Sequence, residues 1–367
     1  MSFLLKDALL NPQSVCTLNN TELNQLLSQA RNSRLLAALG VRLADHRVLE
    51  SLPYTASRHL TSGVVIHEKQ RRDLHYECEK ILAVLAPLGE KLVLLKGAAY
   101  ILGNLTAGRG RLVTDIDIIT PEASLARVEA ALKQAGWRGS PMSAYDEHYY
   151  REWGHEIPPL THRKRGTTLD VHHNILPPTS DAQVDASILW ENLLEVQPGV
   201  YTLSHQDIVI HSATHLFHEG EFHHGLRDLW DIDRMLRDFP RYDNDFWTNL
   251  VPRAQSLGLT GSLYHALSYS AQVFNTPIPK EVLTSAESPS RRLRKPIMDF
   301  LFKRAFTPDP VQRRLPFRNI ALFALYIRSH YLRMPLYLLL PHLIRKAWKK
   351  QLNTDYSELE RGKEAGE

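Results

Sequence analysis

The run Arg111-Leu-Val-Thr-Asp-Ile-Asp-Ile-Ile119 is the most informative part of this 367-residue sequence. Acidic and apolar residues alternate in it with the two-residue period of a β-strand, so Asp115 and Asp117 project from one face. Two like charges on an otherwise apolar strand repel each other unless a cation lies between them. Carboxylate oxygens are preferred ligands of Mg²⁺ and Mn²⁺. The run therefore predicts a strand that binds one of these metal ions.

A second strand is predicted just before this run, over residues 91–95, which form a short and mostly apolar segment. Lys96 and Gly97 follow it and open a short helical stretch. A glycine at this point lets the backbone approach a phosphate group at the start of a helix. The charge of a triphosphate can be neutralised by Lys96, Arg109 or Arg111, although all three cations also suit a solvated surface.

A hairpin is predicted downstream, with strands over residues 154–160 and 167–175 and a polar turn over residues 161–166. In its second strand, Asp170 and His172 share one face. Asp170 is thus a third carboxylate on a strand. The side chain of His172 can bind Asp170, contact a substrate or be satisfied within the fold.

These motifs suit phosphoryl chemistry. Two carboxylates bind the metal ion that bridges a nucleoside triphosphate, and a third completes the metal site or takes a proton from the attacking hydroxyl group. The candidate catalytic residues and metal ligands are Asp115, Asp117 and Asp170. The candidate nucleotide-binding residues are Lys96, Gly97, Arg109 and Arg111, and the candidate substrate contact is His172.

Taken together, these residues resemble an uncharacterised nucleotidyltransferase-like family of the polymerase β-type nucleotidyltransferase superfamily. The resemblance covers about residues 60–240. It implies an α+β fold with a mixed β-sheet and flanking helices, in which Asp115 and Asp117 bind metal and Asp170 is the third acid. Lys96-Gly97-Ala98 stands where the superfamily usually has a Gly-Ser element. The family is common in bacteria, and its acceptor substrates are mostly unknown.

Four parts are predicted along the chain. They are an N-terminal helical segment (1–89), a nucleotidyltransferase catalytic lobe (90–200), a C-terminal helical lobe (201–350) and a flexible acidic tail (351–367). The pattern Ser204-x-x-Asp207 is typical of a helix start and opens the C-terminal lobe. Thr120-Pro121-Glu122 predicts another helix start, directly after the acidic strand.

Basic residues gather in the C-terminal lobe. Residues 291–350 contain fifteen Lys or Arg and two Asp, although the formal net charge of the whole chain is only +4. Such a region suits an anionic partner: a membrane surface, a nucleic acid or a phosphorylated substrate. Aromatic residues are interleaved with its cations, as in membrane-surface helices and in nucleic-acid-binding segments. Helices that pack on the body with their charged heads in solvent would show the same pattern.

Histidines recur at helical spacing near residue 215. They are His211, His215 and His218, followed by His223 and His224. Three imidazoles on one helical face can ligate zinc, but no glutamate lies within the pattern and no acid shares the face. We expect a buried or groove-lining face, with a second metal site as the alternative.

Composition favours a soluble globular protein, with 43% hydrophobic and 23% charged residues. Cys16 and Cys78 have no paired spacing, which argues against a disulfide scaffold and a zinc knuckle. The chain shows neither a secretory signal pattern nor an apolar run of about 20 residues, so we expect a cytoplasmic protein, at most peripheral to a membrane.

The sequence thus predicts a metal-dependent nucleotidyltransferase. It would move a nucleoside monophosphate from a nucleoside triphosphate to an acceptor, which is a small molecule, a protein or a polysaccharide precursor, and release pyrophosphate. One alternative is a glycosyltransferase, because many of these enzymes hold Mn²⁺ and a nucleotide-sugar with an Asp-x-Asp motif. The other is a non-catalytic nucleotide-binding protein of a membrane or polysaccharide-assembly complex.

Overall fold

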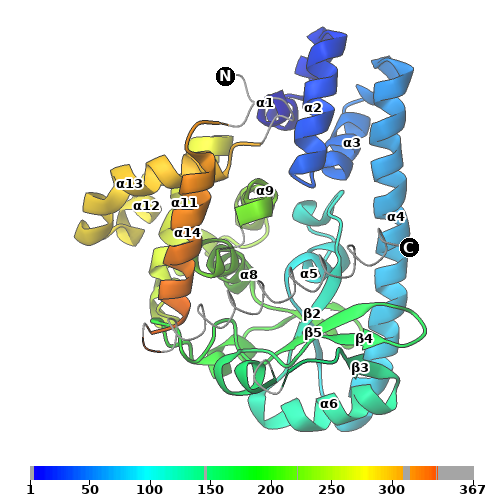
Figure 1. The fold of residues 1–367 in the computed structure, drawn as a ribbon, viewed down its shortest axis with the longest axis vertical. Coiled ribbons are helices and arrows are strands. Elements are labelled where there is room, and N and C mark those ends of the chain that lie inside the picture. Colours follow the sequence, from blue (N-terminus) through cyan, green and yellow to red (C-terminus); the bar gives the residue numbers. More distant parts are fainter. Residues whose placement is uncertain (1–3, 144–146, 221, 309–314, 336, 338–367) are drawn as a thin grey trace, which may run out of the picture.

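The computed structural model describes residues 4–143, 147–220, 222–308, 315–335 and 337. A seven-stranded mixed sheet lies at its centre and helices surround it (Figure 1). The chain is therefore a mixed α+β protein, as predicted. The acidic tail predicted over residues 351–367 lies outside the described residues.

The sheet joins parallel and antiparallel strands in the order β3-β4-β5-β2-β1-β7-β6. Its strands are β1 (Leu92–Leu94), β2 (Asp115–Ile119), β3 (Trp137–Gly139), β4 (Leu160–His162), β5 (Thr168–His172), β6 (Leu194–Gln197) and β7 (Val200–Thr202). The acidic strand β2 lies between β1, which is antiparallel to it, and β5, which is parallel to it.

Side chains alternate across β2 and β5 as the sequence pattern predicts. Ile116 and Ile118 of β2, with Leu169 of β5, are buried in the hydrophobic core. The intervening positions of both strands carry the acids and project from the opposite face. One face of the sheet is thus a packing surface and the other is polar.

The hairpin of β4 and β5 forms with a register that differs from the prediction. Leu160 pairs with Leu169, whereas the predicted strand ends place it opposite Thr167. The residues before β4 run alongside β5 only through the isolated bridge between Glu156 and His172. The strand predicted over residues 154–160 is therefore wrong except at Leu160, because regular pairing begins only there and β4 continues to His162.

Helices of the N-terminal part pack together and against the sheet. They are α1 (Leu4–Leu10), α2 (Asn20–Asn32), α3 (Leu36–Asp45) and α4 (Tyr54–Leu85). A capping box begins α2, since the amide of Glu22 donates to Asn19 and the carboxylate of Glu22 accepts from the amide of Asn19. The long helix α4 runs beside the sheet at the right of Figure 1.

Two shorter helices flank β2. Helix α5 (Lys96–Leu102) begins directly after β1, and α6 (Leu125–Gln134) follows β2. The predicted start at Thr120 is wrong for α6, because a single 3₁₀ turn, Glu122–Ser124, comes first. The hydroxyl group of Thr120 is buried rather than capping a helix.

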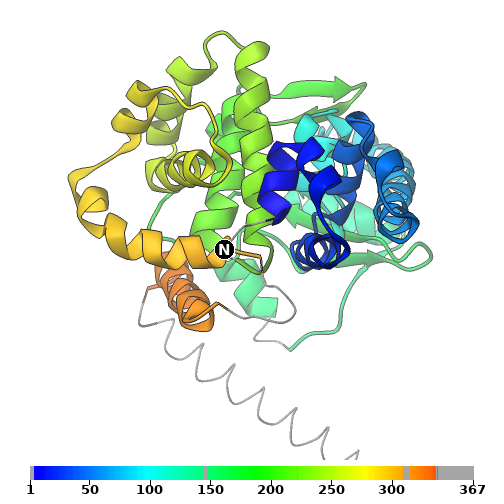
Figure 2. The same ribbon diagram turned by 90° about the horizontal axis from the view of Figure 1, so that it is seen from above.

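The C-terminal helices follow, and the first two of them, α8 and α9, lie between α1–α4 and the others (Figure 2). They are α8 (His205–Thr214), α9 (Gly225–Asp238), α10 (Phe246–Ser256), α11 (Thr260–Phe274), α12 (Lys280–Ala286), α13 (Pro289–Ala305) and α14 (Arg318–Arg333). Ser204 caps α8 by accepting from the amide of Asp207, as predicted. None of the helices in the described ranges is long and apolar enough to cross a bilayer.

Candidate active site

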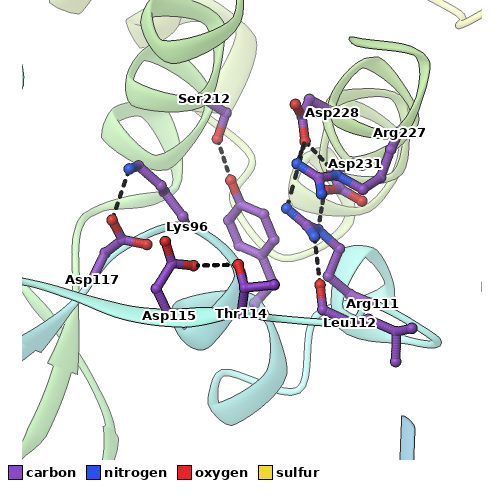
Figure 3. A network of polar contacts seen from close by, with 11 residues as sticks. Lys96, Arg111, Leu112, Thr114, Asp115, Asp117, Ser212, Arg227, Asp228 and Asp231 are labelled. Atoms are coloured by element: carbon purple, nitrogen blue, oxygen red, sulfur yellow. Dashed lines mark hydrogen bonds and ion pairs between the residues drawn. The ribbon is translucent and has the colours of Figure 1, made fainter. Parts of the chain in front are cut away.

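The register of β2 and β5 brings the predicted acids together. Asp117 lies directly opposite Asp170, and Asp115 lies opposite Thr168. Paired residues of neighbouring strands project from the same face of a sheet, so the three carboxylates share one face. Figure 3 shows Asp115, Asp117 and Lys96 on the side of the sheet that faces α8.

Asp117 is a buried anion held by two cationic groups. Its Oδ1 accepts from Lys96 Nζ at 2.7 Å and from His172 Nε2 at 3.0 Å. Burial alone would raise the pKa of Asp117, but Lys96 and His172 outweigh it and lower the pKa far below its usual range. Asp117 is therefore charged at every physiological pH.

Asp170 has the opposite electrostatic character. Burial raises its pKa to about 7, and the nearby charges of Asp117 and Glu156 add to the shift. Its Oδ1 is buried and has no hydrogen-bond partner in the described part of the chain. The carboxyl group of Asp170 thus exchanges its proton near neutral pH, as a general base does.

Lys96 and Gly97 form the turn that leads from β1 into α5, next to the acids of the site. Lys96 has a φ of +47°, the left-handed region that side chains rarely adopt. A Cβ atom at Gly97 would lie 2.5 Å from Cγ1 of Val113, so only glycine lets this turn pass so close to the acidic strand. Such strain is typical of functional sites and here directs the Lys96 ammonium group to Asp117.

His172 is satisfied within the fold, and its partner is Asp117 where the sequence suggested Asp170. Its Nδ1 lies 3.3 Å from Glu156 Oε2, so the ring bridges two carboxylates. Burial opposes protonation of His172, but Glu156 and Asp117 raise its pKa overall. The two carboxylates thus favour the protonated imidazole, which supports Asp117.

The two predicted arginines bind acids of different helices. Arg109 donates to Asp45 at 2.8 Å, and this pair is exposed to solvent. Arg111 is almost buried and binds Asp231 at 2.7 Å and Asp228 at 3.5 Å on α9 (Figure 3). Both arginines thus connect the segment before β2 to surrounding helices, and their predicted contact with nucleotide stays a prediction.

The amino-acid sequence matches one known protein family. The model of a family described as uncharacterised nucleotidyltransferase matches residues 19–275. The chain belongs to this family. The match extends beyond residues 60–240 on both sides and includes every acid of the site. No curated protein and no solved structure matches the chain.

Membership in this nucleotidyltransferase family supports a general nucleotidyl-transfer function with a nucleoside triphosphate as substrate. Nucleotidyltransferases generally use divalent metal ions, and the donor set agrees with that use. Hard divalent cations prefer carboxylate oxygens, and the unpartnered Oδ1 of Asp170 lies beside Asp117 on the neighbouring strand. Asp115 offers a further carboxylate, which accepts from the Thr114 hydroxyl group at 3.0 Å.

A second donor set adjoins the acids of this site. Ligand atoms of His155, Glu156 and His172 all lie within 4.8 Å of one another, and no other group of three among the described His, Cys, Asp and Glu residues converges as closely. Two imidazoles and one carboxylate suit transition metals better than Mg²⁺. Asp115, Asp117 and Asp170 stay farther apart, because like charges repel and Asp117 is turned toward Lys96 and His172.

The histidine-rich helix faces the same site. His211 is buried, and burial together with the charge of Lys96 lowers its pKa well below 6.5. The pKa of His215 falls to about 3 for the same two reasons. His218 binds Ser180 at 2.7 Å. These imidazoles form a neutral, buried face as expected, and the side chain of His223 lies outside the described residues.

Sequence reasoning missed His155 and Glu156. Both lie in the segment that the pattern assigned to a regular strand, so neither was considered next to His172. The bridge between Glu156 and His172 brings them to the site. Pairing the two predicted strands residue by residue was the signal that would have found this segment, since their predicted ends already place His155 opposite His172.

Proposed function

We propose that this chain transfers a nucleoside monophosphate from a nucleoside triphosphate to an acceptor hydroxyl group. The observation that carries the proposal is the pairing of Asp117 with Asp170 across β2 and β5, with pKa values that move in opposite directions. Two neighbouring acids with different protonation behaviour are typical of sites in which one acid stabilises charge and the other transfers a proton.

Each acid has a defined role in the proposed reaction. The acceptor oxygen attacks the α-phosphorus, its proton passes to Asp170, and the bond to the β-phosphate oxygen breaks so that pyrophosphate leaves. Asp115 and Asp117 would hold Mg²⁺ or Mn²⁺, with Asp170 as the third ligand or the base. When bound, the metal ion neutralises phosphate charge and aligns the reacting groups.

Lys96 and His172 are proposed as supporting cations. Lys96 lies 2.7 Å from Asp117, at the turn where Gly97 would let the backbone approach a phosphate group. A bound triphosphate gives the ammonium group a second anionic partner, so Lys96 would contact the phosphates. His172 would keep the Asp117 carboxylate in the orientation that binds metal.

The decisive experiment compares wild type with Asp117→Asn, which keeps the size of the side chain but removes its charge. Each α-labelled nucleoside triphosphate is incubated with protein, Mg²⁺ and cell extract, and label transfer and pyrophosphate are measured. We expect Asp117→Asn to lose about 10²-fold or more of the transfer rate, because it removes a charge that stabilises the transition state. Asp73→Asn, on the exposed surface of α4, is the matched control and should retain wild-type activity.

Three results would contradict the proposal. Equal transfer by wild type and Asp117→Asn would separate the acids from catalysis. Metal-dependent nucleotide binding with no pyrophosphate would favour the non-catalytic alternative. Release of UDP from UDP-sugars in preference to pyrophosphate from nucleoside triphosphates would favour the glycosyltransferase, a class that family membership does not support.

A further inference from the structure

Helix α13 keeps a row of large apolar side chains in solvent. Leu293, Ile297 and Phe300 follow one another at intervals of four and three residues, so they lie on one side of the helix. Leu293 is 83% exposed and Ile297 is 62% exposed. The opposite side of α13 packs inward through Phe302, which is fully buried.

Helix α14 has a second row of the same kind. Its members recur at intervals of three or four residues and are all exposed: Ile320, Phe323, Ile327 and Tyr331. Its inner side is anchored by Arg328, whose guanidinium donates to the carbonyl of Phe217 at 2.6 Å. The aromatic and aliphatic side chains of α14 thus lie in solvent while this arginine points into the protein.

The two helices contact each other and lie at the edge of the molecule (Figures 1 and 2). We call the two rows together the outer apolar face. Soluble monomers rarely leave so many neighbouring large apolar side chains uncovered unless they bind something. As the alternative interpretation of this region expects, α13 and α14 pack on the body and cations of α13 lie in solvent. The exposed apolar rows are an additional feature that this interpretation does not explain.

The charged side chains that are fully exposed on α13 are all basic. Arg292, Arg294 and Lys303 are exposed on α13. The single described acid of the basic region, Asp299, is only partly exposed and accepts from Tyr269 at 3.0 Å. The other acid, Asp309, and six of the fifteen cations lie outside the described residues. Within α13, the exposed surface thus combines large apolar side chains with Lys and Arg.

We propose that the outer apolar face of α13 and α14 docks on a membrane surface that contains anionic lipids. Apolar side chains enter the boundary between headgroups and acyl chains, while Lys and Arg bind the lipid phosphates. This mode of binding needs no spanning helix, in keeping with the described helices. It is independent of the proposed nucleotidyl transfer and would hold for an inactive chain as well.

Charge and shape argue for lipid over the other occupants. A second copy of this chain would bring the same cations against this face, and like charges repel. Nucleic acid would use aromatic planes and cations, but it has no use for exposed Leu293, Ile297 and Ile320, which cannot stack on bases. Lipid is the partner that uses both the cations and the aliphatic side chains.

The experiment is co-sedimentation of the full chain with vesicles, either of pure phosphatidylcholine or of phosphatidylcholine with one-third phosphatidylglycerol. We expect binding to the anionic vesicles, weak binding to the neutral ones, and loss of binding as salt rises. The double variant Leu293→Ser/Phe323→Ser should partition about tenfold more weakly or worse. Both side chains are exposed, so the variant should keep the wild-type melting temperature.

The matched control is Val65→Ser/Tyr242→Ser, which removes two exposed apolar side chains elsewhere on the surface. It should bind vesicles as wild type does. The proposal is overturned if both double variants bind equally, or if wild type ignores anionic vesicles. It is also overturned if Leu293→Ser/Phe323→Ser instead abolishes self-association in sedimentation velocity or binding to single-stranded RNA. Nucleotidyl transfer measured without vesicles should be the same in all three proteins.

Discussion

Asp117 and Asp170 show how two identical side chains at neighbouring positions acquire different chemistry. Their strands place them side by side, but Lys96 and His172 both bind Asp117. Asp170 is left with burial and with the negative charge of its neighbours. Asp117 is thus a permanent anion and Asp170 a titrating acid, because Lys96 and His172 bind Asp117.

This difference predicts that metal binding is coupled to proton release. The pKa of Asp170 is raised to about 7, so the carboxyl group is largely protonated at pH 6 and largely charged at pH 8. A cation that binds the charged form must displace the proton at pH 6. We expect Mg²⁺ to bind more tightly as pH rises from 6 to 8, with release of up to one proton at the lower pH.

Calorimetry in buffers with different ionisation enthalpies measures this proton directly. Asp170→Asn cannot release it and should show the same heat in every buffer. A wild-type protein whose heat of Mg²⁺ binding at pH 6 does not depend on the buffer would contradict the coupling.

The candidate acids could be found from the sequence because alternation along a strand is a local property. Asp115 and Asp117 share a face whatever the strand pairs with, and the resemblance pointed to Asp170. The contact between Lys96 and Asp117 joins residues 21 positions apart and depends on the left-handed backbone at Lys96, which no local pattern predicts for a lysine. The proximity of His155 and Glu156 depends on hairpin register, which is equally non-local.

At the scale of elements, the segment between α5 and β2 is held by a close approach of two backbones. Gly110 has a φ of +76°, and a Cβ atom there would lie 2.4 Å from Cα of Ala38 in α3. Its amide donates to Nε2 of His67 on α4 at 3.2 Å. At this glycine, the segment that leads into the acidic strand is thus held against α3 and α4.

Gly110→Ala should therefore destabilise the protein more than an ordinary glycine replacement. Left-handed strain and the backbone clash together should cost about 3 kcal/mol. Gly89→Ala is the matched control, since Gly89 has a φ of +72° but nothing within 4 Å of the added Cβ. It should cost about 1 kcal/mol. Urea unfolding of both variants measures the difference, and equal losses would mean that α3 yields to the added methyl group.

Elements were predicted best where their signals are local. The capping pattern at Ser204 and the alternation in β2 were confirmed, since each depends on a few adjacent residues. The helix start at Thr120 was wrong because a separate 3₁₀ turn, Glu122–Ser124, lies between it and α6. Exposure of the apolar rows on α13 and α14 depends on what packs against them, which periodicity alone does not reveal.

At the scale of the whole molecule, Arg111 connects the acidic strand to the C-terminal helices. Its buried guanidinium binds Asp231 and Asp228 of α9, and Arg227 also binds Asp228 at 2.7 Å. Tyr100 of α5 adds a hydrogen bond of 2.5 Å to Ser212 of α8. Through these contacts, α8 and α9 are joined to α5 and to the segment before β2. The four-part division of the chain itself stays a prediction.

Arg111→Met should lower stability strongly because it leaves Asp231 buried without its cation. Removing one member of a buried pair costs about 3 kcal/mol or more. Burial already raises the pKa of Asp231 to about 6 against the pull of Arg111, and the substitution should raise it further. The neutral acid tolerates burial, so the stability loss should be smaller at pH 5 than at pH 8.

Arg109→Met is the control, since its pair with Asp45 is exposed and should contribute at most about 1 kcal/mol. Denaturant unfolding at both pH values measures these differences. A loss for Arg111→Met that is the same at pH 5 and pH 8 would show that packing, and not the unpaired carboxylate, causes it.

Because β2 pairs in parallel with β5, the site can form only after both strands have been synthesised. Asp117 and His172 are 55 positions apart, and their strands become neighbours only after the intervening chain has closed into a loop. Pairings between distant segments form late in folding. During synthesis, a chain that has emerged only as far as β2 carries two acids without Asp170 or the His172 support. We therefore expect nascent chains to be inactive until residue 172 has left the ribosome and β5 has joined the sheet.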